Sequence, residues 1–156
     1  MTFITGFPIA RILLSLASNR LSHWQAGIQI PMALLELREL KTALDQGHRL
    51  LGLDLGKKTI GLALSDPGLK IASPVKILYR AKFTPDVESL FKLIDNESVG
   101  GLVLGWPVNM DGSIGPRCDS VRDFAHALMK IRDIPIAFQD ERLSTRAVES
   151  AMVAAD

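Results

Sequence analysis

The sequence predicts a single α/β domain built on a five-stranded mixed sheet. Three extended segments with alternating apolar residues follow one another between residues 49 and 79, a pattern typical of an antiparallel meander. Two further apolar segments come later, each after a helical pattern, so we expect them to lie parallel to the first strand. The length of 156 residues, with 47% hydrophobic and 22% charged residues, fits one globular domain of this kind.

The residue composition excludes several classes of protein. The 18 basic and 17 acidic residues give a formal net charge of +1, so a nucleic-acid partner would have to bind a local basic patch. The single cysteine excludes an internal disulfide and a cysteine-rich zinc site. No apolar run approaches the roughly 18–20 residues of a membrane span, so we expect no membrane partner.

The first 47 residues divide into two parts. Residues 1–31 are interpreted as an N-terminal extension, either disordered or a short amphipathic helix, and Met32 is an alternative natural start. A signal peptide fits less well, because Arg11 interrupts the apolar run instead of preceding it. Residues 32–47 predict a helix that ends near Gly47. The leucines of this segment recur at helical spacing: Leu34, Leu37, Leu40 and Leu44.

Residues 49–65 predict a β-hairpin with one apolar face and one face almost without side chains. In its first strand three leucines alternate with two glycines and an aspartate: Leu51, Gly52, Leu53, Asp54, Leu55 and Gly56. One interpretation is that Asp54 bonds to nearby backbone or to Lys57. The other is that its carboxylate is left accessible to a metal ion or a phosphate, which the flanking glycines would let approach.

The later elements alternate between strand and helix. We expect strands over residues 72–79, 101–105 and 134–138, and helices that begin near Thr84, Pro116 and Ser144. In a sheet of this kind, ligands bind at the carboxyl ends of the parallel strands. Asp54, the loop after Gly105 and the pair Asp140-Glu141 all fall at that edge, so we expect acidic side chains from separate segments to meet there.

Four sequence motifs resemble those of a known protein family. They are GLDLGKKTIGLALSD at 52–66, IASPVK at 71–76, GLVLGWPVNMDGSIGPR at 101–117 and AFQDERLST at 137–145. In this order and spacing they resemble the YqgF/RuvX family of Holliday-junction-resolvase-like proteins, also described as candidate pre-16S rRNA nucleases. The resemblance extends from about Leu50 to about Ala155. It implies a ribonuclease H-like fold over residues 48–156 and a cytoplasmic endonuclease that trims the 5′ end of the small-subunit rRNA precursor, with branched DNA as the alternative substrate.

The resemblance also implies a metal site. Asp54 matches the central acid of the family on the first strand, and either Asp140 or Glu141 matches the acidic position after the fifth strand. These carboxylates would hold Mg²⁺ or Mn²⁺, which polarises the scissile phosphate and activates the attacking water.

Further residues are candidates for contacts with the nucleic acid. They are Lys57, Lys58, Asn109, Asp111, Gly112, Arg117 and Arg142. For Asn109, Asp111 and Gly112 the alternative is simple turn chemistry. For the lysines and arginines the alternative is an ordinary surface charge.

One departure from the family pattern leads to a second expectation. Family members continue into a C-terminal helix that supplies another aspartate, and this element is expected to be missing here, since the sequence ends at Asp156. A site with fewer carboxylates would bind metal weakly, so the alternative function is a catalytically impaired protein that still binds RNA or the ribosome. An actin-like ATPase also begins with an Asp-x-Gly hairpin, but it needs two such domains.

Overall fold

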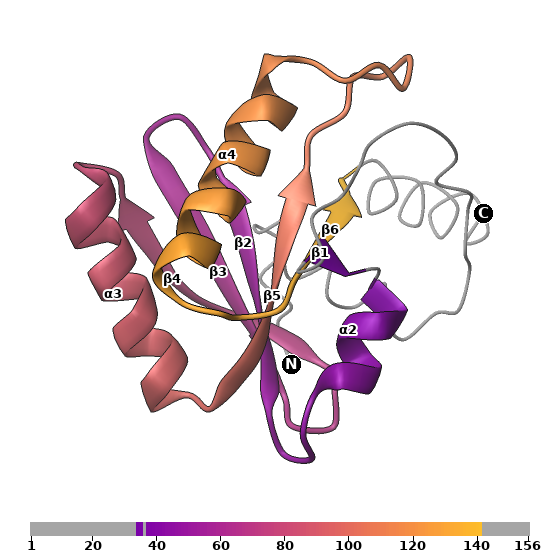
Figure 1. The fold of residues 1–156 in the computed structure, drawn as a ribbon, viewed down its shortest axis with the longest axis vertical. Helices are drawn as coiled ribbons and strands as arrows, with labels where there is room; N and C mark the ends of the chain where they lie inside the picture. Colours follow the sequence, from indigo (N-terminus) through magenta and orange to yellow (C-terminus); the bar gives the residue numbers. More distant parts are fainter. Residues whose placement is uncertain (1–33, 36, 142–156) are drawn as a thin grey trace, which may run out of the picture.

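Six strands and three helices follow one another in the computed structural model, which describes residues 34–35 and 37–141 (Figure 1). In chain order they are β1 (Leu34–Leu35), α2 (Leu37–Ala43), β2 (Arg49–Leu55), β3 (Thr59–Ser65), β4 (Ala72–Tyr79), α3 (Phe83–Asn96), β5 (Val99–Trp106), α4 (Pro116–Ile131) and β6 (Ile136–Asp140). The strands form one sheet in the order β1-β6-β5-β2-β3-β4.

The strand directions confirm the predicted mixed sheet. β2, β3 and β4 form an antiparallel meander. β5 lies parallel to β2, and β6 lies parallel to β5. Both parallel connections contain a helix, which is what allows a chain to return to the same end of a sheet. The two-residue strand β1, which pairs with β6 at the sheet edge, is an addition to the five predicted strands.

The bounds expected for the first helix were wrong. The helix over residues 32–47 is observed as α2, Leu37–Ala43, while Leu34 and Leu35 lie beside Ile136 and Ala137 as a strand. Leucine spacing could not predict that these two residues pair with the backbone of β6. Tertiary pairing here overrides a local pattern. The expected extension, residues 1–31, and the helix expected from Ser144 lie outside the described residues.

The start of α3 also differs from expectation. The helix begins at Phe83, and Lys82 occupies the N-cap position without a side-chain hydrogen bond, so Thr84 is not the cap. The carboxylate of Asp86 instead accepts a hydrogen bond from the backbone N–H of Ala81 at 3.3 Å. This bond satisfies a backbone donor just before the helix and ties that segment to the first turn.

The two faces of the sheet are packed differently. On one face, called here the α3–α4 face, the alternate strand residues Leu51, Leu53 and Leu55 join the buried side chains of α3 and α4 in the main core. On the other, called the α2 face, a smaller cluster joins Leu50 and Val103 to Leu40 of α2. Figure 1 shows α3 and α4 next to each other along the sheet, and α2 near β1 and β6.

A glycine explains how closely α2 approaches the sheet. A Cβ atom built on Gly101 of β5 would lie 2.7 Å from a methyl carbon of Leu40, so a larger residue there would push α2 away. Among the residues that the structure describes, no helix is long and apolar enough to cross a membrane.

Candidate active site

Asp54 stands near the carboxyl end of β2, on the α2 face. It follows Leu53 of the main core, and successive side chains of a strand point to opposite faces. Its pairing partner on β3 is Gly61, so no neighbouring side chain covers the carboxylate from that strand. The side chain is partly buried, and this burial raises the pKa of Asp54, while the positive charge of Arg117 acts in the opposite direction.

Glu141 lies directly after β6 and reaches the same face. Its backbone N–H donates a hydrogen bond to the carbonyl of Trp106 at 3.3 Å, which holds it against the end of β5. A Cβ atom on Gly105 would lie 2.6 Å from Oε1 of Glu141, so the carboxylate of Glu141 occupies the space that a side chain at position 105 would fill. Gly105 follows Leu104, which pairs with Leu53, so it lies at the same level of the sheet as Asp54.

The electrostatics of Glu141 indicate that the two carboxylates are close. Burial raises the pKa of Glu141, and the negative charge of Asp54 raises it further. Arg117 lowers it, and the adjacent Asp140 adds a smaller upward effect. A carboxylate whose ionisation is hindered by burial and by a second carboxylate, beside one arginine, forms a site that gains from a bound cation.

Asp140 belongs to the other face. Ile136 and Phe138 of β6 pack with the main core of the α3–α4 face, whereas Ala137 packs with the cluster of the α2 face. Strand alternation therefore assigns Asp140, which is 9% exposed, to the α3–α4 face. The sequence left Asp140 and Glu141 as alternatives, and the structure brings Glu141 to Asp54.

Arg117 supplies the positive charge of the site. It is the second residue of α4, after Pro116, and its side chain is exposed. Its charge influences both Asp54 and Glu141, so the N-terminus of α4 lies near the carboxyl ends of β2 and β6. The end of a helix with free N–H groups favours anions, and an arginine there adds two-pronged hydrogen bonding to phosphate.

The polar residues of the loop between β5 and α4 bond to one another. Asn109 Nδ2 donates to Ser113 Oγ at 2.8 Å, and Asp111 Oδ1 accepts from the Ser113 N–H at 2.8 Å and its Oγ–H at 2.6 Å. Gly112 has φ of +86°, a conformation in which glycine is favoured. These contacts fit the turn-chemistry interpretation of Asn109, Asp111 and Gly112.

The two lysines of the hairpin turn are exposed, and a third cation joins them. Lys57 and Lys58 lie in the turn between β2 and β3. Arg80, just after β4, donates from its backbone N–H to the Lys58 carbonyl and from Nη1 to the Gly56 carbonyl, each at 2.9 Å. Sequence reasoning missed Arg80 because these partners are more than 20 residues away, and Arg142 lies outside the described residues.

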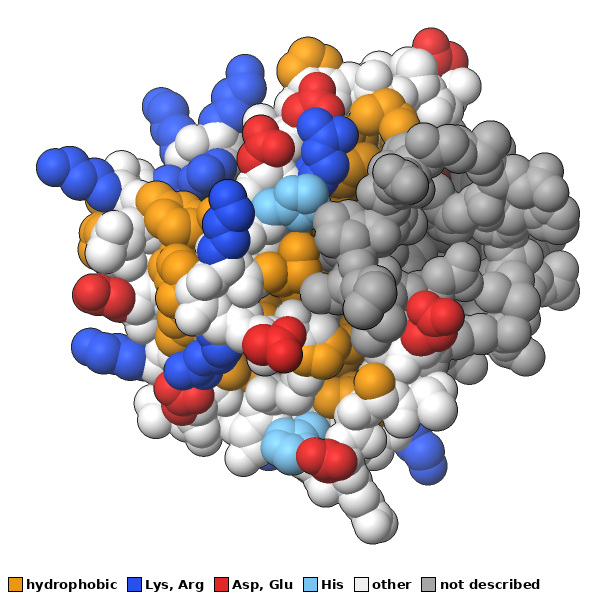
Figure 2. Space-filling view, viewed as in Figure 1, with side chains coloured by type: hydrophobic (Ala, Val, Ile, Leu, Met, Phe, Trp, Pro, Cys, Tyr) orange, Lys and Arg blue, Asp and Glu red, His pale blue; other side chains and the backbone are white. Residues whose placement is uncertain are grey.

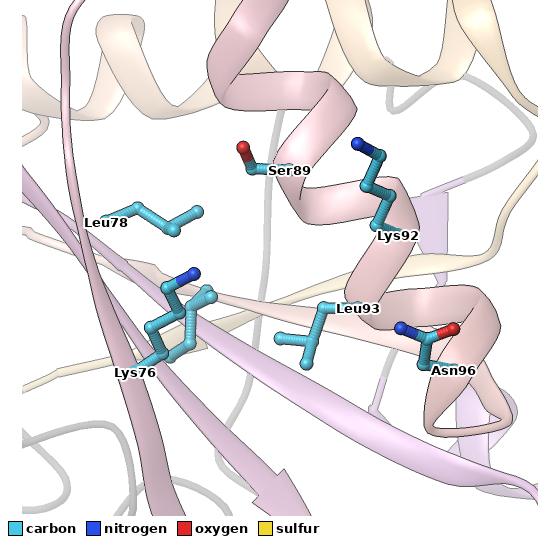
Figure 3. Close-up of a pocket in the computed structure, with 7 residues that line it drawn as sticks. Lys76, Leu78, Ser89, Lys92, Leu93 and Asn96 are labelled. Atoms are coloured by element: carbon cyan, nitrogen blue, oxygen red, sulfur yellow. The ribbon is translucent and has the colours of Figure 1, made fainter.

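A separate cavity lies on the α3–α4 side of the sheet. Its volume is about 210 Å³. Figure 3 shows two lysines at its wall, Lys76 of β4 and Lys92 of α3. It is also lined by Leu62 and Leu78, which face away from Asp54, and by no acidic residue. The cavity is therefore distinct from the carboxylate pair.

The donor set of the site is suited to a hard cation. Within residues 34–35 and 37–141, no group of three or more His, Cys, Asp or Glu side chains is arranged to hold a metal ion. The pair of Asp54 and Glu141 supplies carboxylate oxygens, and Mg²⁺ is commonly bound by one or two carboxylates with waters and substrate phosphates completing its shell. The residues present fit such an ion.

Comparison with known proteins places the chain in a family. The sequence model of the family described as "RuvX: Holliday junction resolvase" matches residues 48–156. A relative from Paramagnetospirillum magneticum is 56% identical over 125 residues, which are 80% of this chain and 81% of the relative. A relative from Rhodospirillum centenum is 52% identical over 130 residues, 80% of this chain and 69% of the relative.

A third relative, from Brucella ovis, is 46% identical over 125 residues, 80% of this chain and 77% of the relative. All three relatives carry the name "Putative pre-16S rRNA nuclease". The family match includes the whole described site, from Asp54 to Glu141. On this match the chain belongs to the RuvX family.

Proposed function

We propose that this protein is a nuclease that cleaves the precursor of 16S rRNA near its 5′ end and requires Mg²⁺ or Mn²⁺. The observation that carries the proposal is the meeting of Asp54 and Glu141 on a glycine-rich face, with Arg117 beside them. The names of the curated relatives support the choice of RNA as substrate. Processing of a ribosomal precursor would place the protein in the cytoplasm.

The carboxylates would hold the metal. Asp54 and Glu141 would each contribute oxygen ligands, and Asp140, on the opposite face, would add only its negative charge. When bound, the metal acts as a Lewis acid toward the phosphate and lowers the pKa of a coordinated water. The raised pKa values of Asp54 and Glu141 mean that these carboxylates are protonated at a higher pH than ordinary ones, so acidic conditions weaken the site.

The neighbouring residues would bind the scissile phosphate. Gly61 flanks Asp54 on β3 and carries no side chain, so a phosphate can approach the carboxylates over this strand, while the space above Gly105 holds the carboxylate of Glu141. The Arg117 guanidinium would donate hydrogen bonds to phosphate oxygens and offset the negative charge that the carboxylates present to the substrate.

The test is cleavage of an RNA that spans the 5′ end of mature 16S rRNA, with and without Mn²⁺. Asp54→Asn and Glu141→Gln should each lower the rate by at least about 100-fold, the range for removal of an electrostatic interaction from the transition state. The matched control is Asp133→Asn, since Asp133 is exposed in the segment before β6, at the amino ends of the parallel strands and away from the site. Metal-dependent cleavage that survives both site variants would contradict the proposal.

Branched DNA is the second candidate substrate, favoured by the description of the matching family. A four-way DNA junction in the same assay compares the two directly. Binding of either substrate without cleavage, under conditions that load the metal, would favour the alternative of a catalytically impaired protein.

A further inference from the structure

Positive charge is concentrated on the β3–β4 hairpin and the turns that flank it. Residues 56–83 contain six basic residues and one acidic residue, which leaves 12 of the 18 basic and 16 of the 17 acidic residues to the rest of the chain. The acidic residue is Asp66, whose carboxylate accepts hydrogen bonds from the backbone N–H groups of Gly68, Lys70 and Ile71. This local charge is notable in a chain with a formal net charge of only +1.

Four residues of this segment form what we call the basic aromatic strip: Lys57, Lys58, Tyr79 and Arg80. Arg80 is held against the hairpin turn by its hydrogen bonds to Gly56 and Lys58. Within the described part of the chain, none of the three cations forms an ion pair with an acidic side chain. Figure 2 shows basic side chains gathered at the upper left, near the turn between β2 and β3 and the start of α3.

Tyr79 is an aromatic side chain in an unusually exposed position. It is 79% exposed at the end of edge strand β4, where it pairs with Thr59 of β3. Burying a tyrosine is normally favourable, so an aromatic ring left in water among cations suggests a partner that stacks on it. A nucleic-acid base meets this description, because its phosphates attract cations and its ring stacks on aromatics.

Tyr79 of the strip and the carboxylates share one face of the sheet. Asp54 pairs with Gly61, and Gly61 pairs with Ile77, so these three residues form one row across β2, β3 and β4. Tyr79 lies two residues beyond Ile77 and therefore points to the same face. Two strand spacings separate β2 from β4, about 10 Å, and the residue between them in the row is a glycine.

We propose that the basic aromatic strip binds a single-stranded segment of the substrate next to the cleaved bond, with one base stacked on Tyr79. The inference rests on the proposed nuclease function, since it assigns the strip to the same substrate. Stacking on an exposed tyrosine requires an unpaired base, so the strip would select single-stranded RNA over a duplex. Lys57, Lys58 and Arg80 would contact the phosphates on either side of that base.

The primary test measures binding without cleavage. In an Asp54→Asn background and without divalent metal, fluorescence anisotropy compares a single-stranded RNA with a duplex of the same sequence. Tyr79→Ala should weaken binding of the single strand by about tenfold or more, and Tyr79→Phe should preserve it. The duplex should bind both variants equally. An unchanged single-strand affinity, or an equal loss on the duplex, would overturn the proposal.

The phosphate contacts have their own readout. The binding constant falls as salt rises, so a plot of its logarithm against log salt has a negative slope. Replacing Lys57 or Lys58 with Ala should make this slope less steep by about 0.7 for each phosphate that the lysine neutralises. Lys130→Ala is the matched control, since Lys130 is exposed in the last turn of α4, at the other end of that helix from Arg117. Equal slopes in all three variants would place the phosphate-binding cations elsewhere.

The same preparations separate this inference from the proposed function and from a protein partner. If the strip binds RNA as described but the wild-type protein cleaves nothing, the proposed function fails and the inference stands. If cleavage occurs but Tyr79→Ala changes neither binding nor rate, the inference fails alone. Val75 and Ile77 are also exposed on edge strand β4, where a second copy of the chain could pair. Sedimentation therefore measures the oligomeric state. A dimer that dissociates in Tyr79→Ala would overturn the RNA assignment.

Discussion

The two faces of one sheet differ in composition, although the same strands supply both. Toward α3 and α4, β2 and β3 contribute a leucine or an isoleucine at every second position, and these side chains are 9% exposed or less. Toward the α2 face, the same strands contribute Leu50 and Ala63 to the smaller cluster, but Gly52, Asp54 and Gly61 at the other positions. Stability is thus concentrated on one face, which leaves the other free to hold a carboxylate near a ligand at the cost of poorer packing.

A pair of isoleucines provides the largest contrast between the faces. Ile60 on β3 is 1% exposed in the main core, whereas Ile77 on β4 is 41% exposed on the α2 face. Ile60→Ala should lower the free energy of unfolding by about 2–5 kcal/mol, because it removes buried methyl groups and leaves a cavity. Ile77→Ala should cost less than about 1 kcal/mol. Urea denaturation measures both, and similar losses would show that the α2 face is packed as well as the core.

Much of this contrast could be predicted from the sequence. Alternation of leucine with glycine defined the hairpin and marked Asp54 as an exception on its face, because period-two patterns are local. The choice between Asp140 and Glu141 could not be made, since it depends on where β6 ends and on the space above Gly105. Arg80 was missed because its partners come from another turn, and β1 because a two-residue strand depends on pairing with distant β6.

The second prediction concerns the carboxylates and pH. Burial raises the pKa values of Asp54 and Glu141 above their ordinary values, so the native state binds protons more tightly than the unfolded chain. Their contribution to stability is therefore greatest below about pH 4 and is lost as the pH rises through the raised native pKa values. At pH 7 Asp54→Asn should stabilise the protein while lowering activity, because the variant carries no buried charge at this position.

Thermal unfolding at a series of pH values checks this sign. The difference in Tm between Asp54→Asn and wild type should shrink as the pH falls toward 4, because the wild-type carboxylates become neutral. The control is Asp66→Asn, where hydrogen bonds to backbone N–H groups lower the pKa of the native carboxyl. That variant should be destabilised at pH 7. If burial did not govern the pKa of Asp54, the two variants would not change the stability in opposite directions.

The smallest expected change in stability belongs to Gly105→Ala, which tests whether the α2 face is shaped for its carboxylates. The added Cβ would lie 2.6 Å from Oε1 and 3.3 Å from Cγ of Glu141, so the side chain of Glu141 must move. Because a flexible side chain near the end of a strand can move at little cost, and alanine suits a strand better than glycine, the free energy of unfolding should change by less than about 1 kcal/mol.

The effect of Gly105→Ala on activity should be much larger, because displacing a ligand by about 1 Å can cost about 100-fold in rate. Gly105→Ala should therefore retain the urea midpoint of the wild type while losing Mn²⁺ affinity by calorimetry and most of its cleavage rate. The same change is then made in a Glu141→Gln background. If Gly105→Ala causes no additional loss of Mn²⁺ affinity or cleavage rate there, Gly105 acts by making room for the Glu141 carboxylate. An equal loss in both backgrounds would show that the effect of Gly105→Ala does not pass through Glu141.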